Sequence, residues 1–241
     1  EYLFPNTKTV EFIKKDKEIF RVASNDLRIF PPNFLTHYKI QSIEGYDPLY
    51  LLSYGALISA SERKEPNIEP PYGFNRIITP HNLDSKIIDL LNVKYVFSLS
   101  DIKSKKFELV FEEGQTKVYK NKNFIPRVFF AEKTISKKTN QEQIDAMFTE
   151  DLSWTAIVDG FDFIDKLSIG KAEIKKYSEN EIIIETKNTG NGFLVLSDAN
   201  YPTWEAFIDG KKVEVFKTDY ALRGILVPKG DHEIVFKNRL F

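Results

Sequence analysis

The stretch that decides the fold lies near the carboxyl end of the chain. Residues 195–211 read VLSDANYPTWEAFIDGK, and residues 220–236 read YALRGILVPKGDHEIVF. Apolar and polar side chains alternate between short turn sequences such as Asp209-Gly210 and Pro228-Lys229-Gly230. This pattern predicts short antiparallel strands joined by tight turns, with a type I′ hairpin at Asp209-Gly210.

The same alternation extends upstream of this stretch. It is clear in residues 181–185 (EIIIE) and 212–216 (KVEVF). Turn residues recur at a spacing of about 8–12 residues, which is typical of a sandwich built from hairpins. We therefore predict that residues 171–241 form an antiparallel β-sandwich of the jelly-roll or carbohydrate-binding-module type.

Residues 1–135 mix helical and strand periodicity. Asn6 is expected to cap a first helix that ends near Lys15, Pro48 to open a second over residues 49–57, and Asn82 to cap a third that reaches Leu91. Strands are predicted over residues 19–23, 93–97, 107–111, 117–120 and 127–130, and a long surface loop over residues 61–80. The fold class is therefore α+β, with a mixed α/β lobe over 1–135, a junction over 136–170 and the sandwich over 171–241.

Composition excludes several classes of function. The 241 residues contain no cysteine, so disulfides, cysteine–zinc sites and thiol catalysis are ruled out. The formal net charge of −1 provides no field to gather nucleic acid, and no nucleic-acid partner is expected. No signal peptide, no apolar run of membrane-spanning length and no initiating Met are present. The chain is therefore expected to be a segment of a longer protein.

Motifs in the carboxyl-terminal stretch carry a family resemblance. They are Leu196-Ser197-Asp198, Tyr201-Pro202-Thr203-Trp204, Ile208-Asp209-Gly210-Lys211, Leu222-Arg223-Gly224-Ile225 and Val227-Pro228-Lys229-Gly230-Asp231-His232. In this order they resemble the extracytoplasmic tail of the YfhO-like family of polytopic bacterial membrane proteins. Thr203 stands where the family has Gly. Residues 43–49, 91–96 and 125–129 add weaker similarity, so the resemblance covers most of the chain.

The resemblance implies a role that composition alone does not reveal. Such proteins are similar to membrane glycosyltransferases that take a sugar from a polyprenyl-phosphate carrier, using an acid embedded in the membrane. A soluble domain on the outer side of the cell membrane covers that site or binds the acceptor. This chain would be that domain, without a catalytic residue or a cofactor of its own. Its implied partners are the membrane-embedded remainder of the same polypeptide and a cell-envelope glycan.

Three residues of the carboxyl-terminal stretch are candidates for ligand binding. Tyr201 and Trp204 could stack on a sugar ring, whereas Trp204 could instead cover the core of the sandwich. Arg223 could meet a phosphate, or form an ion pair with Asp198 or Asp219. The structural alternative is favoured for Trp204 and for Arg223.

Tyr46 and Asp47 are the candidates in the first half of the chain. A loop that ends at Pro48 can present an aromatic ring and an acid together, or Asp47 can cap the helix that Pro48 opens. No metal site is expected, because His37, His81 and His232 are each isolated. The series Asp159, Asp162 and Asp165 lacks the central Gly and closing Glu of a calcium loop.

Two other functions compete with the membrane-protein interpretation. A free carbohydrate-binding module, or an accessory domain of a glycoside-acting enzyme, requires an exposed aromatic strip on one face of the sandwich. A soluble hydrolase requires two carboxyl groups about 5–10 Å apart, for example among Asp26, Asp47 and Asp198.

Overall fold

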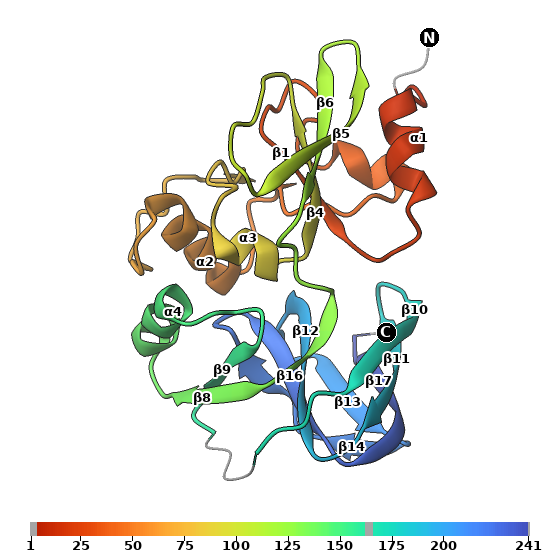
Figure 1. Cartoon of the computed structure of the whole chain (residues 1–241). Coiled ribbons are helices and arrows are strands. Elements are labelled where there is room, and N and C mark those ends of the chain that lie inside the picture. Colours follow the sequence, from red (N-terminus) through yellow and green to blue (C-terminus); the bar gives the residue numbers. More distant parts are fainter. Residues whose placement is uncertain (1–3, 162–165, 241) are drawn as a thin grey trace. The chain divides into compact units, whose positions relative to one another are not determined.

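The computed structural model describes residues 4–161 and 166–240. They form two compact units, one that ends at Pro126 and one that begins at Arg127 (Figure 1). Each unit has its own sheets and its own hydrophobic core. Most of the regular structure is β, with few helices and several sheets, as expected for a β-rich α+β chain.

The first unit is built on a four-stranded sheet with the order β1-β4-β6-β5. The first two strands are parallel and the other neighbours are antiparallel. Strands β2 and β3 pair with each other and form a separate two-stranded ribbon. The elements are α1 (Lys8–Lys15), β1 (Arg21–Ser24), the 3₁₀ helix η1 (Phe34–Tyr38), β2 (Gly45–Tyr46), α2 (Leu52–Arg63), β3 (Ile77–Ile78), α3 (Lys86–Leu90), β4 (Val93–Ser98), β5 (Phe107–Glu113) and β6 (Thr116–Asn121).

Two of the predicted helix caps in this unit are wrong by one to three residues. Thr7, not Asn6, caps α1, because the Thr7 side chain accepts from the N–H of Val10 at 3.3 Å. Ser85, not Asn82, caps α3, because the Asn82 amide is used elsewhere and donates to the Ser61 carbonyl oxygen at 2.6 Å. A neighbouring residue with a suitable side chain can replace the predicted cap when tertiary contacts recruit the first one.

The second helix also begins later than predicted. α2 starts at Leu52 instead of directly after Pro48, and it continues to Arg63, where Lys64 adopts a left-handed conformation. The loop predicted over residues 61–80 therefore begins only after Arg63, and β3 lies near its end.

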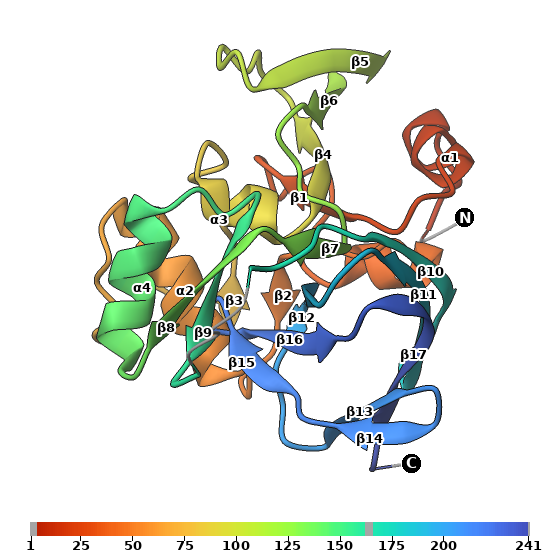
Figure 2. The same cartoon turned by 60° about the horizontal axis from the view of Figure 1, so that its bottom comes forward.

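The second unit contains two sheets. One has the strand order β10-β11-β17-β13-β14 and is antiparallel throughout. The other has the order β7-β12-β16-β15-β9-β8, and its last pair, β8-β9, is parallel and connected through α4 (Figure 2). The elements are β7 (Val128–Ala131), β8 (Lys133–Lys137), α4 (Asn140–Thr149), β9 (Thr155–Asp159), β10 (Lys171–Tyr177), β11 (Glu181–Asn188), β12 (Gly192–Ala199), β13 (Trp204–Ile208), β14 (Lys211–Val213), β15 (Phe216–Thr218), β16 (Leu222–Val227) and β17 (Gly230–Asn238).

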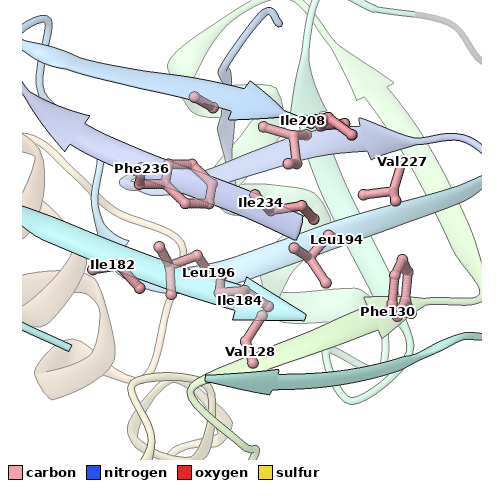
Figure 3. Close-up of a cluster of buried hydrophobic side chains, with 12 residues drawn as sticks. Val128, Phe130, Ile182, Ile184, Leu194, Leu196, Ile208, Val227, Ile234 and Phe236 are labelled. Carbon is pink, nitrogen blue, oxygen red and sulfur yellow. The ribbon is translucent and has the colours of Figure 1, made fainter. Parts of the chain in front are cut away.

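The two sheets of this unit share one apolar core (Figure 3). Alternate residues of β11 and β17 contribute from the five-stranded sheet, and alternate residues of β12 contribute from the six-stranded sheet, as a period of two requires. The intervening residues of β12, Phe193 and Val195, belong to a second cluster on the opposite face. This explains why β12 is buried along almost its whole length, without the half-exposed pattern of a surface strand.

The predicted boundary after residue 135 falls inside β8 of the second unit. β7 pairs with β12 in antiparallel register, and β9 pairs with β15, so residues 127–135 and part of the predicted junction belong to the six-stranded sheet. These pairings join strands that are far apart in the sequence, and local periodicity carries no signal for them.

The Asp209-Gly210 hairpin is confirmed. Ile208 pairs with Lys211, which leaves a two-residue loop, and the φ angles of Asp209 and Gly210 are 49° and 78°. Two consecutive positive φ angles define the type I′ turn predicted from the dipeptide.

Candidate functional site

Tyr46 lies on the small β2-β3 ribbon of the first unit, and Asp47 follows it. The side chain of Asn33 fixes the backbone of Tyr46, since Nδ2 donates to the Tyr46 carbonyl oxygen at 2.8 Å and Oδ1 accepts from the Tyr46 N–H at 3.1 Å. Asp47 Oδ1 accepts from the N–H of Leu49 at 2.8 Å. Asp47 therefore stabilises a local turn and does not cap α2, whose N-cap is Leu51.

Tyr46 belongs to a group of exposed apolar side chains, which we call the apolar surface. Its members are Tyr46 (45% exposed), Leu49 (87%), Leu52 (67%) and Ile77 (38%). Tyr46 and Ile77 are directly opposite one another in the ribbon, and the other two residues follow in the next six positions of the chain. Grouped exposure of large apolar side chains is typical of an interaction surface.

A partly buried acid, Glu44, directly precedes β2 of this ribbon. Glu44 accepts hydrogen bonds from the N–H of Ser24 and from the Ser42 hydroxyl, the latter at 2.8 Å. Burial raises the pKa of the Glu44 carboxyl to about 7, although both hydrogen bonds act in the opposite direction. This group can therefore exchange a proton near neutral pH, and only the packing of distant segments reveals it.

The three acids proposed for a hydrolytic pair each have another partner. Asp26 binds the guanidinium of Arg28, which lowers the pKa of Asp26 to about 2. Asp47 holds its turn, and Asp198 is buried in a charge cluster of the second unit. Each of these carboxyl groups is therefore engaged in a structural contact, and the low pKa of Asp26 is the opposite of what a general acid needs.

The charge cluster of the second unit is centred on Asp198. Arg127 Nη1 donates to Asp198 Oδ1 at 2.9 Å, and the Tyr177 hydroxyl lies 3.0 Å from both carboxylate oxygens. The Arg223 guanidinium approaches the other oxygen at 3.7 Å. Asp198 and both arginines are almost fully buried.

A bulge in β12 aims Asp198 into this cluster. The register between β12 and β16 shifts between Leu196 and Ala199, so Ser197 and Asp198 lie outside the regular ladder. Bulges commonly redirect a side chain in this way. Arg127 and Tyr177 come from the start of the six-stranded sheet and from β10, and no spacing in the sequence connects them with Asp198.

Arg223 connects the two sheets of the second unit. It lies on β16, and its guanidinium stacks over the Trp204 ring of β13 at 4.1 Å from the centroid and lies 5.7 Å from that of Phe236 on β17. Of the two acids predicted as ion-pair partners, Arg223 pairs with Asp198. Asp219 accepts instead from the N–H of Ile157 at 2.8 Å.

Tyr201 and Trp204 occupy the two ends of one turn, where the N–H of Trp204 donates to the Tyr201 carbonyl oxygen at 3.1 Å. Trp204 is half-buried and packs against the core shared by the two sheets, in addition to its contact with Arg223. Tyr201 is 44% exposed. The two rings therefore have different environments, and only Tyr201 presents a largely open surface.

Metal-binding geometry is absent from the part of the chain that the structure describes, where no three His, Asp or Glu side chains are placed to hold an ion. His232 of β17 contacts Asp209 in the turn of the β13-β14 hairpin, with 2.7 Å between Nδ1 and Oδ2. Of the Asp159, Asp162 and Asp165 series, the last two lie outside the described residues.

The first unit also contains an open cavity of about 400 Å³. It is lined by polar and apolar side chains together, namely Asn25, Glu62, Lys64, His81, Asn82, Leu83, Asp84, Ile102 and Phe107. None of these positions was a sequence candidate, because they come from five separate segments with no common motif.

Together these features define a β-rich protein whose candidate sites are the apolar surface and the open cavity of the first unit. Residues 161–239 match the model of a family described as bacterial membrane protein YfhO. The match lies within the second unit and confirms, over these residues, the resemblance predicted from the sequence. No curated protein and no solved structure matches the chain significantly. Among the helices of residues 4–161 and 166–240, none is long and apolar enough to cross a membrane.

Proposed function

We propose that this chain is the water-exposed, extracytoplasmic region of a polytopic bacterial membrane protein that resembles lipid-linked-sugar glycosyltransferases. The observation that carries the proposal is the YfhO match over residues 161–239. The chain itself performs no transfer in this proposal, and the catalytic acid lies in the membrane-embedded remainder of the polypeptide. Its role is to brace that remainder, with binding of an acceptor glycan as a second contribution.

The apolar surface supports the bracing role. Leu49 and Leu52 are among the most exposed large apolar side chains of the described residues, and they flank one short loop. Covering them against the membrane-embedded part would remove apolar area from water, which is favourable by about 25 cal/mol per Å². Tyr46 contributes an aromatic ring with a hydroxyl, a side chain suited to a partly wet interface.

The second unit supports the glycan-binding role in part. Two sheets that share one core suit a β-sandwich comparable to a carbohydrate-binding module, and Tyr201 offers an exposed ring at its edge. Trp204 and Arg223 support this role by packing beneath the turn that carries Tyr201. The alternative function is that of a free carbohydrate-binding module. The exposed Tyr201 ring is the observation that favours it.

Sidedness in the membrane can be measured directly because the chain contains no cysteine. Single cysteines are placed at Asn75 and Lys211, which are exposed on the first and second unit respectively. In intact cells that express the full-length protein, a membrane-impermeant maleimide should label both positions. Labelling that requires permeabilised cells contradicts the extracytoplasmic location. Sugar transfer by the purified chain alone contradicts the non-catalytic role.

The bracing role has its own test. A photo-crosslinking residue at position 49 of the full-length protein should join to the membrane-embedded part of the same polypeptide. The matched control is position 169, where Ile169 is also exposed, on the second unit. Crosslinks from position 49 to lipid alone, or equal crosslinking from both positions, contradict the role.

A further inference from the structure

The cavity of the first unit lies where a parallel strand pair ends. Asn25 follows the last residue of β1 directly, and Ile102 lies in the segment that leaves β4. These two strands are parallel, so their carboxyl ends meet at one edge of the sheet. Ligands of α/β sheets commonly bind outside this edge.

Hydrogen bonds hold the loop that forms one wall of the cavity. Glu62 Oε1 accepts from the N–H groups of His81 and Asn82, each at 2.9 Å. The Asn82 amide donates to the Ser61 carbonyl oxygen at 2.6 Å. The loop is therefore fastened to the end of α2 by backbone and side-chain contacts.

A buried lysine supports the same loop from the other side. Lys106 Nζ donates to the Leu83 carbonyl oxygen at 2.8 Å and to that of Ser85 at 3.1 Å, and it forms an ion pair with Asp89 at 2.7 Å. The Ser104 hydroxyl donates to Asp84 Oδ1 at 2.5 Å. Contacts of this kind fix the cavity before a ligand arrives, which reduces the entropy lost on binding.

The charges that line the cavity exclude several ligand classes. Two carboxylates, Glu62 and Asp84, face one lysine, Lys64, so a phosphate or another polyanion would meet net repulsion. His81 joins these acids in the lining, but no three metal-ligating side chains of the described residues are placed to hold an ion. A cationic or a neutral organic ligand remains, and the apolar part of the lining favours a neutral ligand that carries hydroxyl groups.

The polar groups suit hydroxyl groups, and the apolar groups suit a C–H face. Carboxylate oxygens accept hydrogen bonds, whereas the amides of Asn25 and Asn82 offer both donors and acceptors. Ile102 and Phe107 supply an apolar part of the lining. A lining that combines polar side chains with an aliphatic group matches the two kinds of surface that a pyranose presents.

We infer that the cavity of the first unit binds a single unit of a neutral sugar, with Asn25 and His81 contacting its hydroxyl groups and the half-buried Ile102 contacting its C–H face. The inference rests on the proposed function in one respect, which is that the acceptor glycan is the biological source of the sugar. The binding itself is a property of the purified chain.

Titration of the purified 241-residue chain with free glucose, galactose and N-acetylglucosamine tests the inference, with NMR shift perturbation as the measurement. At least one sugar should bind in the millimolar range and perturb residues 25, 81–84 and 102. The Asn25→Ala/His81→Ala double variant should weaken binding by at least about tenfold, the equivalent of about 1.4 kcal/mol in lost hydrogen bonds. Its fold is checked by circular dichroism and by the NMR spectrum without sugar.

Two control variants test whether the sugar binds at this cavity. Asn75→Ala removes an exposed asparagine of the same unit outside the cavity and should leave binding unchanged. Tyr201→Ala tests the second unit, where the Tyr201 ring can itself contact a sugar. The sugar-induced shifts of residues 25, 81–84 and 102 should persist in this variant, and their loss in this variant alone would move the sugar site to the second unit and overturn the inference.

The ligand class has a separate control. Inorganic phosphate, titrated alone, should not perturb the cavity, and binding of phosphate in preference to every sugar overturns the inference. Failure of all three sugars to bind at concentrations far above the millimolar range also overturns it. Neither result changes the labelling experiment on membrane sidedness, so the inference and the proposed extracytoplasmic location fail independently.

Discussion

Asp198 is the acid that faces two buried arginine side chains of the second unit. Its carboxylate contacts the guanidinium groups of Arg127 and Arg223. We expect Asp198→Asn to lower the free energy of unfolding by about 3–5 kcal/mol, because removing one partner leaves buried cations without compensation. Urea denaturation of the purified chain measures the loss.

A matched variant separates charge from hydrogen bonding. Tyr177→Phe removes a hydroxyl that contacts the same carboxylate but leaves its charge in place. Its expected cost is about 1 kcal/mol, the ordinary contribution of one hydrogen bond. Equal losses in the two variants would show that the ion pairs contribute little.

Asp219 is expected to destabilise the second unit at neutral pH. It is fully buried, and its Oδ2 has no hydrogen-bond partner in the part of the chain that the structure describes. Burial raises the pKa of its carboxyl from 3.8 to about 7. The folded state therefore binds this proton more tightly than the unfolded state, and the free energy of unfolding falls as pH rises from about 4 to 7.

Asp219→Asn should remove this pH dependence. The amide oxygen can still accept from the N–H of Ile157, and Asn tolerates the φ angle of 48° at this position. At pH 8 the variant should be more stable than the native chain by on the order of a few kcal/mol, and the difference should shrink toward pH 5. The exposed Asp231→Asn serves as the control in the same denaturation series. A variant that is less stable at every pH contradicts this account.

His232 on β17 and Asp209 in the type I′ turn form a pH-dependent contact. Nδ1 lies 2.7 Å from the Asp209 carboxylate and Nε2 lies 3.2 Å from the Lys229 carbonyl oxygen, so both ring nitrogens face acceptors. The Asp209 carboxylate raises the pKa of His232, and the imidazole in turn lowers the pKa of Asp209. The histidine contribution is present below about pH 6.5 and is lost as pH rises through the raised pKa, and the aspartate contribution is lost only in acid.

The measurement for this pair is an NMR titration of the His232 ring. Asp209→Asn keeps the shape of the side chain and the left-handed turn residue but removes the charge. We expect the pKa of His232 to fall in this variant. An unchanged titration curve would falsify the assignment of the shift to Asp209.

Strand packing in the second unit explains the glycine of the Leu222-Arg223-Gly224-Ile225 motif. Gly224 lies on β16, and a methyl group there would meet the Phe193 ring and the Thr218 hydroxyl, each at 2.5 Å. Both neighbours are buried, so neither can move away freely. We expect Gly224→Ala to lower the free energy of unfolding by about 1–3 kcal/mol, the usual cost of overpacking.

Gly45 provides the matched control for this substitution. It also lies in a strand, and a methyl group on it would have no neighbour within 4 Å among the described atoms. Thermal denaturation measures both variants, and Gly45→Ala should be nearly neutral. Because Gly→Ala reduces the entropy of the unfolded chain, backbone entropy alone predicts no loss, and a comparable loss in both variants would contradict the assignment of the cost to the contact with Phe193.

Strands and hairpins were predictable because their signals are local. The alternation in β11 and the Asp209-Gly210 dipeptide each specify structure within a few residues. Helix starts were less predictable, since Asn82 has the side chain of a cap but bonds to Ser61 instead. Competition between a local and a distant hydrogen bond is settled only in the folded chain.

The sites show the same division between local and distant information. The ion pair of Arg223 with Asp198 was one of two predicted ion pairs, because both residues lie in the same carboxyl-terminal stretch. The contacts of Arg127, Tyr177 and Glu44 were not predicted, because Asp198 lies far from Arg127 and Tyr177 in the sequence and the Ser24 N–H lies far from Glu44. The cavity of the first unit is assembled from separate segments and was likewise invisible in the sequence.

The division of the chain into two units predicts which fragments can fold. A fragment that starts at residue 127 keeps β7, whose residues Val128 and Phe130 belong to the core shared by the two sheets. A fragment that starts at residue 136, the boundary drawn from the sequence, loses β7 and most of β8 and exposes the edge of β12. Exposed edges of buried strands favour aggregation.

We therefore expect residues 127–241 to give a cooperative thermal transition and a dispersed NMR spectrum, and residues 136–241 to give neither. The deleted segment also contains Arg127, so the shorter fragment loses the closest cation of Asp198 together with part of its core. A third fragment that starts at residue 127 but carries Phe130→Ala separates the two effects, because it keeps the cation and the strand while removing one buried ring at a typical cost of about 3–5 kcal/mol. If residues 136–241 fold as stably as residues 127–241, β7 is dispensable and the second unit is smaller than its contacts indicate.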